Sequence, residues 1–298
     1  MKRELSDTEQ IERSIFKHFK STLWAPFLTS INRYELIQPG DRIALCISGG
    51  KDSMCMALLF RLLQKHSDIP FETVYLMMDP GYSPENRKKN EENAERLGLS
   101  LSVFETNIFA IANAQEKKPC YLCARMRRGH LYNRARELGC NKIALGHHLN
   151  DIIETTLMSM FYSSKLETII PKSHSENFPG MELIRPMYCV KEDAVRSWAA
   201  YNHLSFIQCA CRFTENTSGE DPSLSSKRLE SKNLIRQLKK TNPEIEDNIF
   251  RALHAVQIES FPGYKADDRM HSFLENYDDF GKLRFHENKE NAKKESDQ

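Results

Sequence analysis

A hexapeptide near residue 50 combines small, hydroxyl-bearing and charged side chains in an order suited to holding phosphate. It lies between an apolar run at residues 43–47 and a helical stretch at 54–66, and it reads Ser48-Gly49-Gly50-Lys51-Asp52-Ser53. Two adjacent glycines permit a backbone path in which successive amides point at phosphate oxygens. Lys51 adds positive charge, and the following helix adds the free amides and dipole of its N-terminus. These residues predict a phosphate site for ATP.

The hexapeptide is not a Walker A loop, because that motif has four spacers between its glycines, followed by lysine and then serine or threonine. The order Ser-Gly-Gly-x-Asp-Ser after a first strand instead resembles the signature of the ATP pyrophosphatases. Those enzymes split ATP between its alpha and beta phosphates to adenylate a substrate. The alternative is that the two glycines only make a tight turn. We favour the functional interpretation because strand, hexapeptide and helix occur in the required order.

The cysteines form a second set of residues with chemical potential. Eight cysteines in a chain without a secretory signal favour metal or catalytic roles over disulfides. Cys120 and Cys123 are separated by two residues, a spacing that lets one metal centre bind both sulfur atoms. Cys209 and Cys211 follow a strand-like run at residues 204–208. Four thiolates would close a zinc site, whereas three around an iron–sulfur cluster would leave one iron open, and the residue types allow either. We interpret the remaining four cysteines as small buried hydrophobic residues: Cys46, Cys55, Cys140 and Cys189.

Strand and helix patterns alternate around these residues. Strands are predicted at residues 43–47, 74–78, 101–106 and 142–145, and helices at 54–66, 83–97, 121–138 and 150–162. This alternation predicts an α/β, Rossmann-like fold, with a parallel sheet, helices on both faces and right-handed crossovers. A nucleotide then binds at the carboxyl ends of the strands, where the hexapeptide, Asp79, Gly146 and His147 are placed.

The chain of 298 residues carries a formal net charge of +1, so bulk charge says nothing about nucleic acid. We expect an N-terminal helical segment at 1–38, a nucleotide-binding domain at 39–212, a helical C-terminal region at 213–280 and a disordered tail at 281–298. No apolar run reaches the length needed to cross a bilayer, and no secretory h-region is present. A cytoplasmic protein without a membrane partner is therefore expected.

Together these motifs resemble the tRNA 2-thiocytidine synthetase (TtcA) family of PP-loop ATP pyrophosphatases. The resemblance runs from about residue 20 to 212, and besides the hexapeptide it rests on residues 119–129, 142–148, Asp151 and 184–186. It implies the adenine nucleotide alpha hydrolase-like form of the Rossmann-like fold. It also implies an ATP- and Mg²⁺-dependent sulfurtransferase, in which a tRNA pyrimidine, cytidine 32, is adenylated at its C2 oxygen and then receives sulfur.

The resemblance also assigns roles to individual residues. The hexapeptide, Asp79, Gly146 and His147 would bind the nucleotide, while Asp52 would hold magnesium. The candidate catalytic residues are Lys51, Asp52 and Asp151. A [4Fe-4S] cluster would be held by Cys120, Cys123 and Cys209. Cys211 is the alternative third ligand, because the family ends on a pair with two spacers and this chain has one.

A helix rich in arginine follows the first cysteine pair and could track an RNA backbone. Its basic residues are Arg125, Arg127, Arg128, His130, Arg134 and Arg136. Proximity to Cys123 favours Arg125 and Arg128 as tRNA contacts over a merely solvated face. A second basic helix, at residues 227–240, has the same two interpretations. The other expected partners are a sulfur donor, such as a cysteine desulfurase or free sulfide, and a second copy of the chain in a homodimer.

Several alternatives stay open at this point. His147 or His148 could transfer a proton, or could cap and pack the next helix, and Asp151 could be an ordinary first-turn acidic residue. The whole chain could be another adenylating PP-loop enzyme, a lysidine-type or amide-forming ligase with structural zinc. It could also be a non-catalytic, metal-stabilised RNA-binding protein. The hexapeptide argues against the last, and cysteines near the strand ends argue against the ligase.

Overall fold

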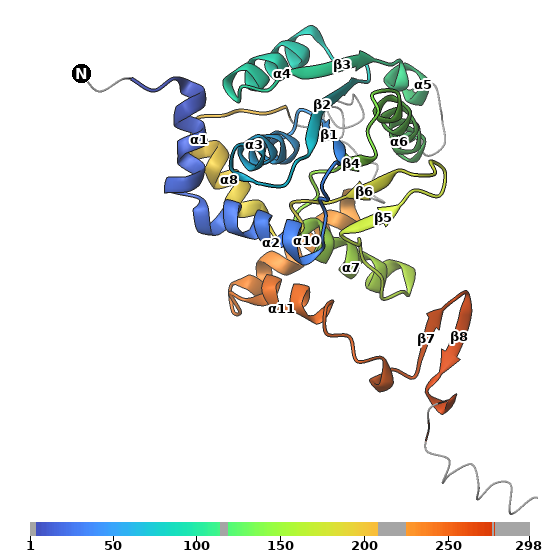
Figure 1. Ribbon diagram of the computed structural model, residues 1–298. Helices are drawn as coiled ribbons and strands as arrows, with labels where there is room; N and C mark the ends of the chain where they lie inside the picture. Colours follow the sequence, from blue (N-terminus) through green and yellow to red (C-terminus); the bar gives the residue numbers. More distant parts are fainter. Residues whose placement is uncertain (1–3, 114–118, 208–224, 276, 278–298) are drawn as a thin grey trace, which may run out of the picture. The chain divides into compact units, whose positions relative to one another are not determined.

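The computed structural model describes residues 4–113, 119–207, 225–275 and 277, and its main feature is a mostly parallel sheet (Figure 1). Within the described residues the sheet has six strands in the order β3-β2-β1-β4-β6-β5. They are β1 (Arg42–Ile47), β2 (Glu72–Asp79), β3 (Leu101–Glu105), β4 (Lys142–Ala144), β5 (Lys172–His174) and β6 (Glu182–Ile184). All neighbours are parallel except β5 and β6, which are antiparallel. The predicted α/β class is confirmed.

The central strand β1 divides the hydrophobic core into two. Its residues Ile43, Leu45 and Ile47 belong to one cluster, and Ala44 and Cys46 to the other. This division follows from the alternation of side chains along a strand. The first cluster is covered by α1 (Asp7–Lys17), η1 (Lys20–Trp24), α2 (Ala25–Arg33), α3 (Lys51–His66), α4 (Pro84–Arg96) and α8 (Glu192–Tyr201), the second by α6 (Pro119–Glu137). Helices therefore lie on both faces of the sheet, as predicted.

Local signals in the sequence fix several helix ends. The amide of Glu9 donates to Ser6 Oγ at 3.2 Å and the amide of Ser6 to Glu9 Oε2 at 2.9 Å, a capping box that begins α1. Ser83 caps α4. Gly98, with φ +63°, follows the end of α4, because a left-handed residue there favours glycine. Two further helices lie between β3 and β5 in the sequence, α5 (Ile108–Asn113) and α7 (Leu149–Ser163).

The later part of the chain differs in places from the prediction. Residues 204–207, expected to begin a strand, form none, and residues 208–224 lie outside the described residues together with Cys209 and Cys211. Next come α10 (Ser225–Lys239), which contacts α7, and α11 (Ile245–Ala252). No helix in the described ranges is both long and apolar enough to span a membrane.

The chain divides into two compact units, Met1–Glu246 and Asp247–Gln298. The second contains η2 (Ile258–Ser260), an antiparallel hairpin of β7 (Gly263–Ala266) and β8 (Arg269–Ser272), and η3 (Phe273–Glu275). A helical region was expected at residues 213–280, and the hairpin was not predicted from the sequence. The tail at 281–298 falls outside the described residues.

Candidate functional site

A cavity of about 460 Å³ lies at the carboxyl ends of β1, β2 and β4. Ser48, Asp52 and Ser53 line it from the hexapeptide, and Met78 from β2. Three more predicted site residues line it from the segment after β4: Gly146, His147 and Asp151. Residues that are distant in sequence thus meet where parallel strands end, as expected for a nucleotide site in this fold class.

The hexapeptide forms a tight loop closed by the Ser53 hydroxyl. Ser53 Oγ accepts a hydrogen bond from the amide of Ser48 at 3.1 Å and donates to the carbonyl oxygen of Gly50 at 3.0 Å. Gly49 has φ +81°, and a Cβ there would overlap the Asn90 side chain and lie 2.7 Å from Ile207 Cδ1. Both the conformation and the crowding therefore require glycine at position 49.

Gly146 brings the segment after β4 against the N-terminus of α3. A Cβ at this position would lie 3.1 Å from the amide nitrogen of Ser53 and 3.2 Å from the carbonyl carbon of Asp52. The absence of a side chain lets the two backbones approach beside the cavity. The first turn of α3, with its free amides, borders that space, an arrangement suited to anions.

Lys51 lies between two carboxylates. Its Nζ is 3.0 Å from Asp52 Oδ2 and 3.2 Å from Glu192 Oε1. Burial acts to lower the pKa of Lys51, but Asp52 and Glu192 outweigh it and raise the pKa, so the side chain is an ammonium. Lys51 is not among the residues that line the cavity, and Glu192 was not identified from the sequence.

Asp52, His148 and Asp151 lie next to one another at the starts of α3 and α7. Asp52 Oδ1 is 3.7 Å from His148 Nε2, and it is buried without a hydrogen-bond partner among the described residues. His148 caps α7: its Nδ1 accepts from the amide of Asp151 at 3.3 Å, and Asp151 Oδ2 accepts from the amide of His148 at 3.0 Å. A buried carboxylate oxygen without a donor fits a hard cation such as Mg²⁺.

His147 lines the cavity and carries a second buried atom, Nδ1, for which the described residues offer no hydrogen-bond partner. Burial lowers its pKa to about 4, and Arg185, Arg228 and His148 act in the same direction against Asp151. The imidazole is therefore neutral at neutral pH and can accept a hydrogen bond or a proton from a bound molecule.

Asp79 ends β2, as expected, and its side chain is hydrogen-bonded to the loop that follows. Its Oδ1 accepts from the amides of Gly81 at 2.9 Å and Tyr82 at 2.7 Å, and Arg87 Nη1 lies 3.5 Å from its Oδ2. Asp79 does not line the cavity. It shapes the loop after β2, and the Tyr82 hydroxyl from that loop donates to the carbonyl oxygen of Ser48 at 3.1 Å.

The basic face of α6 contributes Arg127 and Arg128 to the cavity. Arg125 is exposed and does not line it. Sequence proximity to the cysteines suggested Arg125 and Arg128, but which arginines face the cavity depends on the rotation of the helix. The structure therefore brings Arg128 to the cavity and adds Arg127.

The cysteines are described unequally. The backbone at Cys120 and Cys123 lies at the start of α6, but their side chains, like all of Cys209 and Cys211, are outside the described residues. Because α6 joins parallel strands, it runs back along the sheet and begins at the edge where β3 ends. Within the described residues no three His, Cys, Asp or Glu side chains are grouped to hold a metal ion.

Cys46 is the one described cysteine that lines the cavity. Burial raises the pKa of its thiol to about 12, with Cys140 acting in the same direction. It is therefore a protonated, inert thiol at neutral pH, because the thiolate is the form that binds metal and attacks. This agrees with its interpretation as a small buried hydrophobe.

Known proteins resemble this chain over most of its length. The PP-loop domain family matches residues 12–237. A tRNA-cytidine(32) 2-sulfurtransferase of Burkholderia cenocepacia (strain HI2424) is 36% identical over 250 residues, which are 82% of this chain and 71% of that protein. The enzyme of the same name from Syntrophotalea carbinolica (strain DSM 2380 / NBRC 103641 / GraBd1) is 35% identical over 232 residues, 76% of this chain and 86% of that protein.

Among solved structures, a similar one is the U34-tRNA thiolase NcsA from Methanococcus maripaludis with its [4Fe-4S] cluster. It has a TM-score of 0.61 and 21% sequence identity, and the alignment covers 81% of this chain and 80% of that one. At this identity the likeness shows the fold alone.

Proposed function

Because the chain belongs to the PP-loop family, with the tRNA-cytidine(32) 2-sulfurtransferases as its relatives, we propose that it is an ATP-dependent tRNA sulfurtransferase. Its substrate is cytidine 32 of tRNA, the nucleotide given in the name of the relatives, and its product is 2-thiocytidine. The observation that carries the proposal is the convergence of the hexapeptide with Gly146, His147 and Asp151 on one cavity at the strand ends.

The chemistry explains why a nucleotide site is needed. The C2 oxygen of a pyrimidine is a poor leaving group. Attack of this oxygen on the alpha phosphate of ATP forms an O-adenylated base and releases pyrophosphate. A sulfur nucleophile then attacks C2, and AMP leaves with the oxygen. With sulfide as the sulfur source both steps are redox-neutral. Persulfide sulfur carried by a cysteine desulfurase would in addition need a two-electron reductant such as a thiol.

The residues at and beside the cavity have distinct tasks in this reaction. The hexapeptide amides hold the phosphates, and Lys51 stabilises their charge. Asp52 Oδ1, buried without a partner in the described residues, and Asp151 would hold Mg²⁺. Bound Mg²⁺ supplies charge neutralisation at the phosphates. Arg127 and Arg128 attract the tRNA backbone, and His147 borders the reacting groups as a neutral acceptor.

We also propose that the protein holds an iron–sulfur centre. Cys120, Cys123 and either Cys209 or Cys211 would hold a [4Fe-4S] cluster, supported by the family resemblance and by the start of α6 at the functional edge of the sheet. A cluster with three protein ligands supplies an open iron for the incoming sulfur. The donor is a cysteine desulfurase or free sulfide. Thiolate ligands escape oxidation to disulfides in a reducing compartment, so we propose that the protein acts in the cytoplasm.

The test is a reconstituted reaction. The protein is purified without oxygen and incubated with unmodified tRNA, Mg-ATP and sulfide, after which nucleosides and pyrophosphate are quantified. We expect the purified protein to be brown. We expect the reaction to form 2-thiocytidine and pyrophosphate in equal amounts. A colourless zinc protein that forms no thionucleoside would contradict the proposal and favour the ligase alternative.

A further inference from the structure

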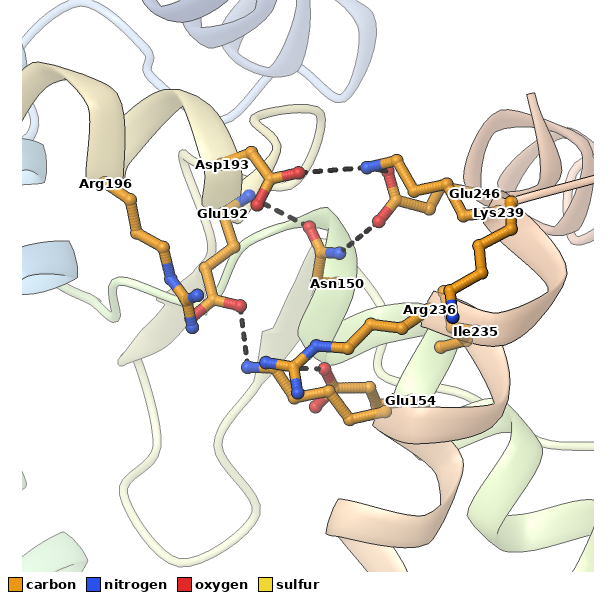
Figure 2. Close-up of a pocket in the computed structure, with 11 residues that line it drawn as sticks. Asn150, Glu154, Glu192, Asp193, Arg196, Ile235, Arg236, Lys239 and Glu246 are labelled. Carbon is orange, nitrogen blue, oxygen red and sulfur yellow. Dashed lines mark hydrogen bonds and ion pairs between the residues drawn. The ribbon is translucent and has the colours of Figure 1, made fainter. Parts of the chain in front are cut away.

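A second cavity, of about 310 Å³, lies among α7, α8 and α10 and is lined mostly by charged side chains. Figure 2 shows Glu192 at one side of this group, with Asn150 and Glu246 close by. Glu192 is the first residue of α8, and only 8% of its side chain is exposed. A buried carboxylate needs partners to remain charged.

Cations surround the Glu192 carboxylate on both oxygens. Oε1 is 2.7 Å from Arg196 Nη2 and 3.2 Å from Lys51 Nζ, while Oε2 is 2.7 Å from Lys232 Nζ. Burial acts to raise the pKa of Glu192, but hydrogen bonds from Lys232 and Arg196 and the charge of Lys51 lower it to about 2. The side chain is thus an anion throughout the neutral pH range.

The backbone around Glu192 is held as firmly as its side chain. Its amide donates to Asn150 Oδ1 at 2.9 Å, and Asn150 Nδ2 donates to Glu246 Oε1 at 2.8 Å. Asn150 is itself buried, in the first turn of α7. The position of the carboxylate is therefore fixed independently of Lys51.

We propose that Glu192 is a positioning residue that fixes the ammonium of Lys51 at the start of α3, ready for the phosphates of ATP. Lys51 has one other carboxylate partner in the described residues, Asp52. Asp52 also faces the nucleotide cavity and is the candidate magnesium ligand, so its charge is shared once Mg-ATP binds. Glu192 lines the second cavity and not the nucleotide cavity, so it can keep its contact with Lys51 when Mg-ATP binds. This role rests on the proposed function.

Glu192 also connects Lys51 with a basic helix. Lys232 of α10, its partner at Oε2, lies 4.0 Å from Glu154 Oε1, and Arg228 of the same helix lies 3.4 Å from Asp151 Oδ1. One helix therefore contacts both the anchor of Lys51 and a candidate magnesium ligand. A preorganised charge is worth more at a phosphate than one that must first be ordered.

The test is a double-mutant cycle on pyrophosphate release, with wild type, Glu192→Gln, Lys51→Ala and the double variant. We expect Glu192→Gln to raise the KM for ATP about tenfold with kcat within about twofold, because it weakens a contact made equally in ground and transition states. In the Lys51→Ala background the same substitution should change KM less than about twofold. Equal KM changes in both backgrounds would overturn the proposal, since Glu192 would then act independently of Lys51.

Two controls keep the outcome decisive. Asp193→Asn removes the neighbouring carboxylate, which is 66% exposed and 2.9 Å from Lys239 Nζ, and should leave the KM for ATP unchanged. If Glu192→Gln does not fold, Glu192→Asp keeps the charge but withdraws it from Lys51, and the cycle is repeated with it. A wild type that releases no tRNA-dependent pyrophosphate contradicts the proposed function. An active wild type with an additive cycle contradicts the role of Glu192 alone.

Discussion

Asp52 and His148 face each other at the starts of α3 and α7, with Asp52 Oδ1 3.7 Å from His148 Nε2. The carboxylate belongs to the phosphate loop, and the imidazole caps the helix that carries Asp151. The contact therefore joins the two segments on which a metal–nucleotide site depends. His148 acts here as a helix cap, and Asp52 keeps a buried oxygen without a hydrogen-bond donor in the described part of the chain.

Loss of the loop lysine should impair ATP cleavage. Lys51→Ala removes the ammonium of the phosphate loop. We expect the kcat/KM for ATP in tRNA-dependent pyrophosphate release to fall about 10²-fold, mainly through KM, because a charged contact made in ground and transition states alike is lost. Lys88→Ala is the matched control, because Lys88 is 77% exposed and pairs only weakly, at 3.7 Å, with Glu92. Pyrophosphate release by Lys51→Ala at the native rate would count against the assignment of the loop.

Gly49 and Gly40 are two of the glycines with positive φ, and comparing them distinguishes backbone strain from crowding. Both have a left-handed conformation, at +81° and +86°, but a Cβ meets other atoms within 4 Å only at Gly49. Gly40→Ala should therefore cost about 1 kcal/mol of unfolding free energy. Gly49→Ala should cost more and also weaken ATP binding, because either the phosphate loop or the Asn90 and Ile207 side chains beside it must shift. Thermal melts and ATP titrations measure both effects, and equal losses in the two variants would contradict the crowding at Gly49.

The sequence was most informative where a local signal determines the backbone. The helix ends predicted at residues 97 and 138 are each within one residue of the observed ends of α4 and α6, and Gly98 and Gly139, both with positive φ, follow them. The apolar run at residues 43–47 predicted the central strand, which is confirmed. The strands β5 and β6 were missed, since each has three residues, too few for a periodic pattern. The equally short β4 was predicted from its place between two helices.

The site was predicted where residues follow strand ends and missed where tertiary packing decides. Gly146 and Asp151 could be placed from the topology of a parallel sheet. Glu192 could not, because in the sequence it is an ordinary acidic residue in the first turn of a helix. Arg127 was passed over for Arg125 since helix rotation cannot be derived from proximity to a cysteine. Asp79, although correctly at a strand end, binds its own loop.

Protonation of His147 should make stability depend on pH. Its pKa falls from 6.5 to about 4 on folding, so between these values the unfolded chain binds the proton more readily. The part of the unfolding free energy that is linked to neutral His147 is fully present above pH 6.5, and it is lost as the pH falls from 6.5 through about 4. The loss approaches ~3 kcal/mol at 1.36 kcal/mol per pKa unit. Urea unfolding of wild type and His147→Gln at several pH values isolates this part, and parallel curves for the two proteins would contradict it.

Individual cysteine substitutions should identify the cluster ligands. Cys120→Ala and Cys123→Ala should each lower the iron bound after anaerobic reconstitution, because a thiolate ligand is lost. Of Cys209→Ala and Cys211→Ala, only the variant that lacks the third ligand should lose iron to a similar extent. Cys55→Ala is the control, since Cys55 is a free, buried cysteine of α3. Undiminished iron in Cys120→Ala and Cys123→Ala would exclude the proposed ligand set.

The most direct test of the proposed function is mass spectrometry of tRNA nucleosides from cells with and without the gene for this chain. We predict that 2-thiocytidine disappears from the deletion strain, returns with the wild-type gene and does not return with Lys51→Ala, while other thionucleosides persist. Full retention of 2-thiocytidine in the deletion strain, or loss of a thiouridine in its place, would contradict cytidine thiolation by this protein.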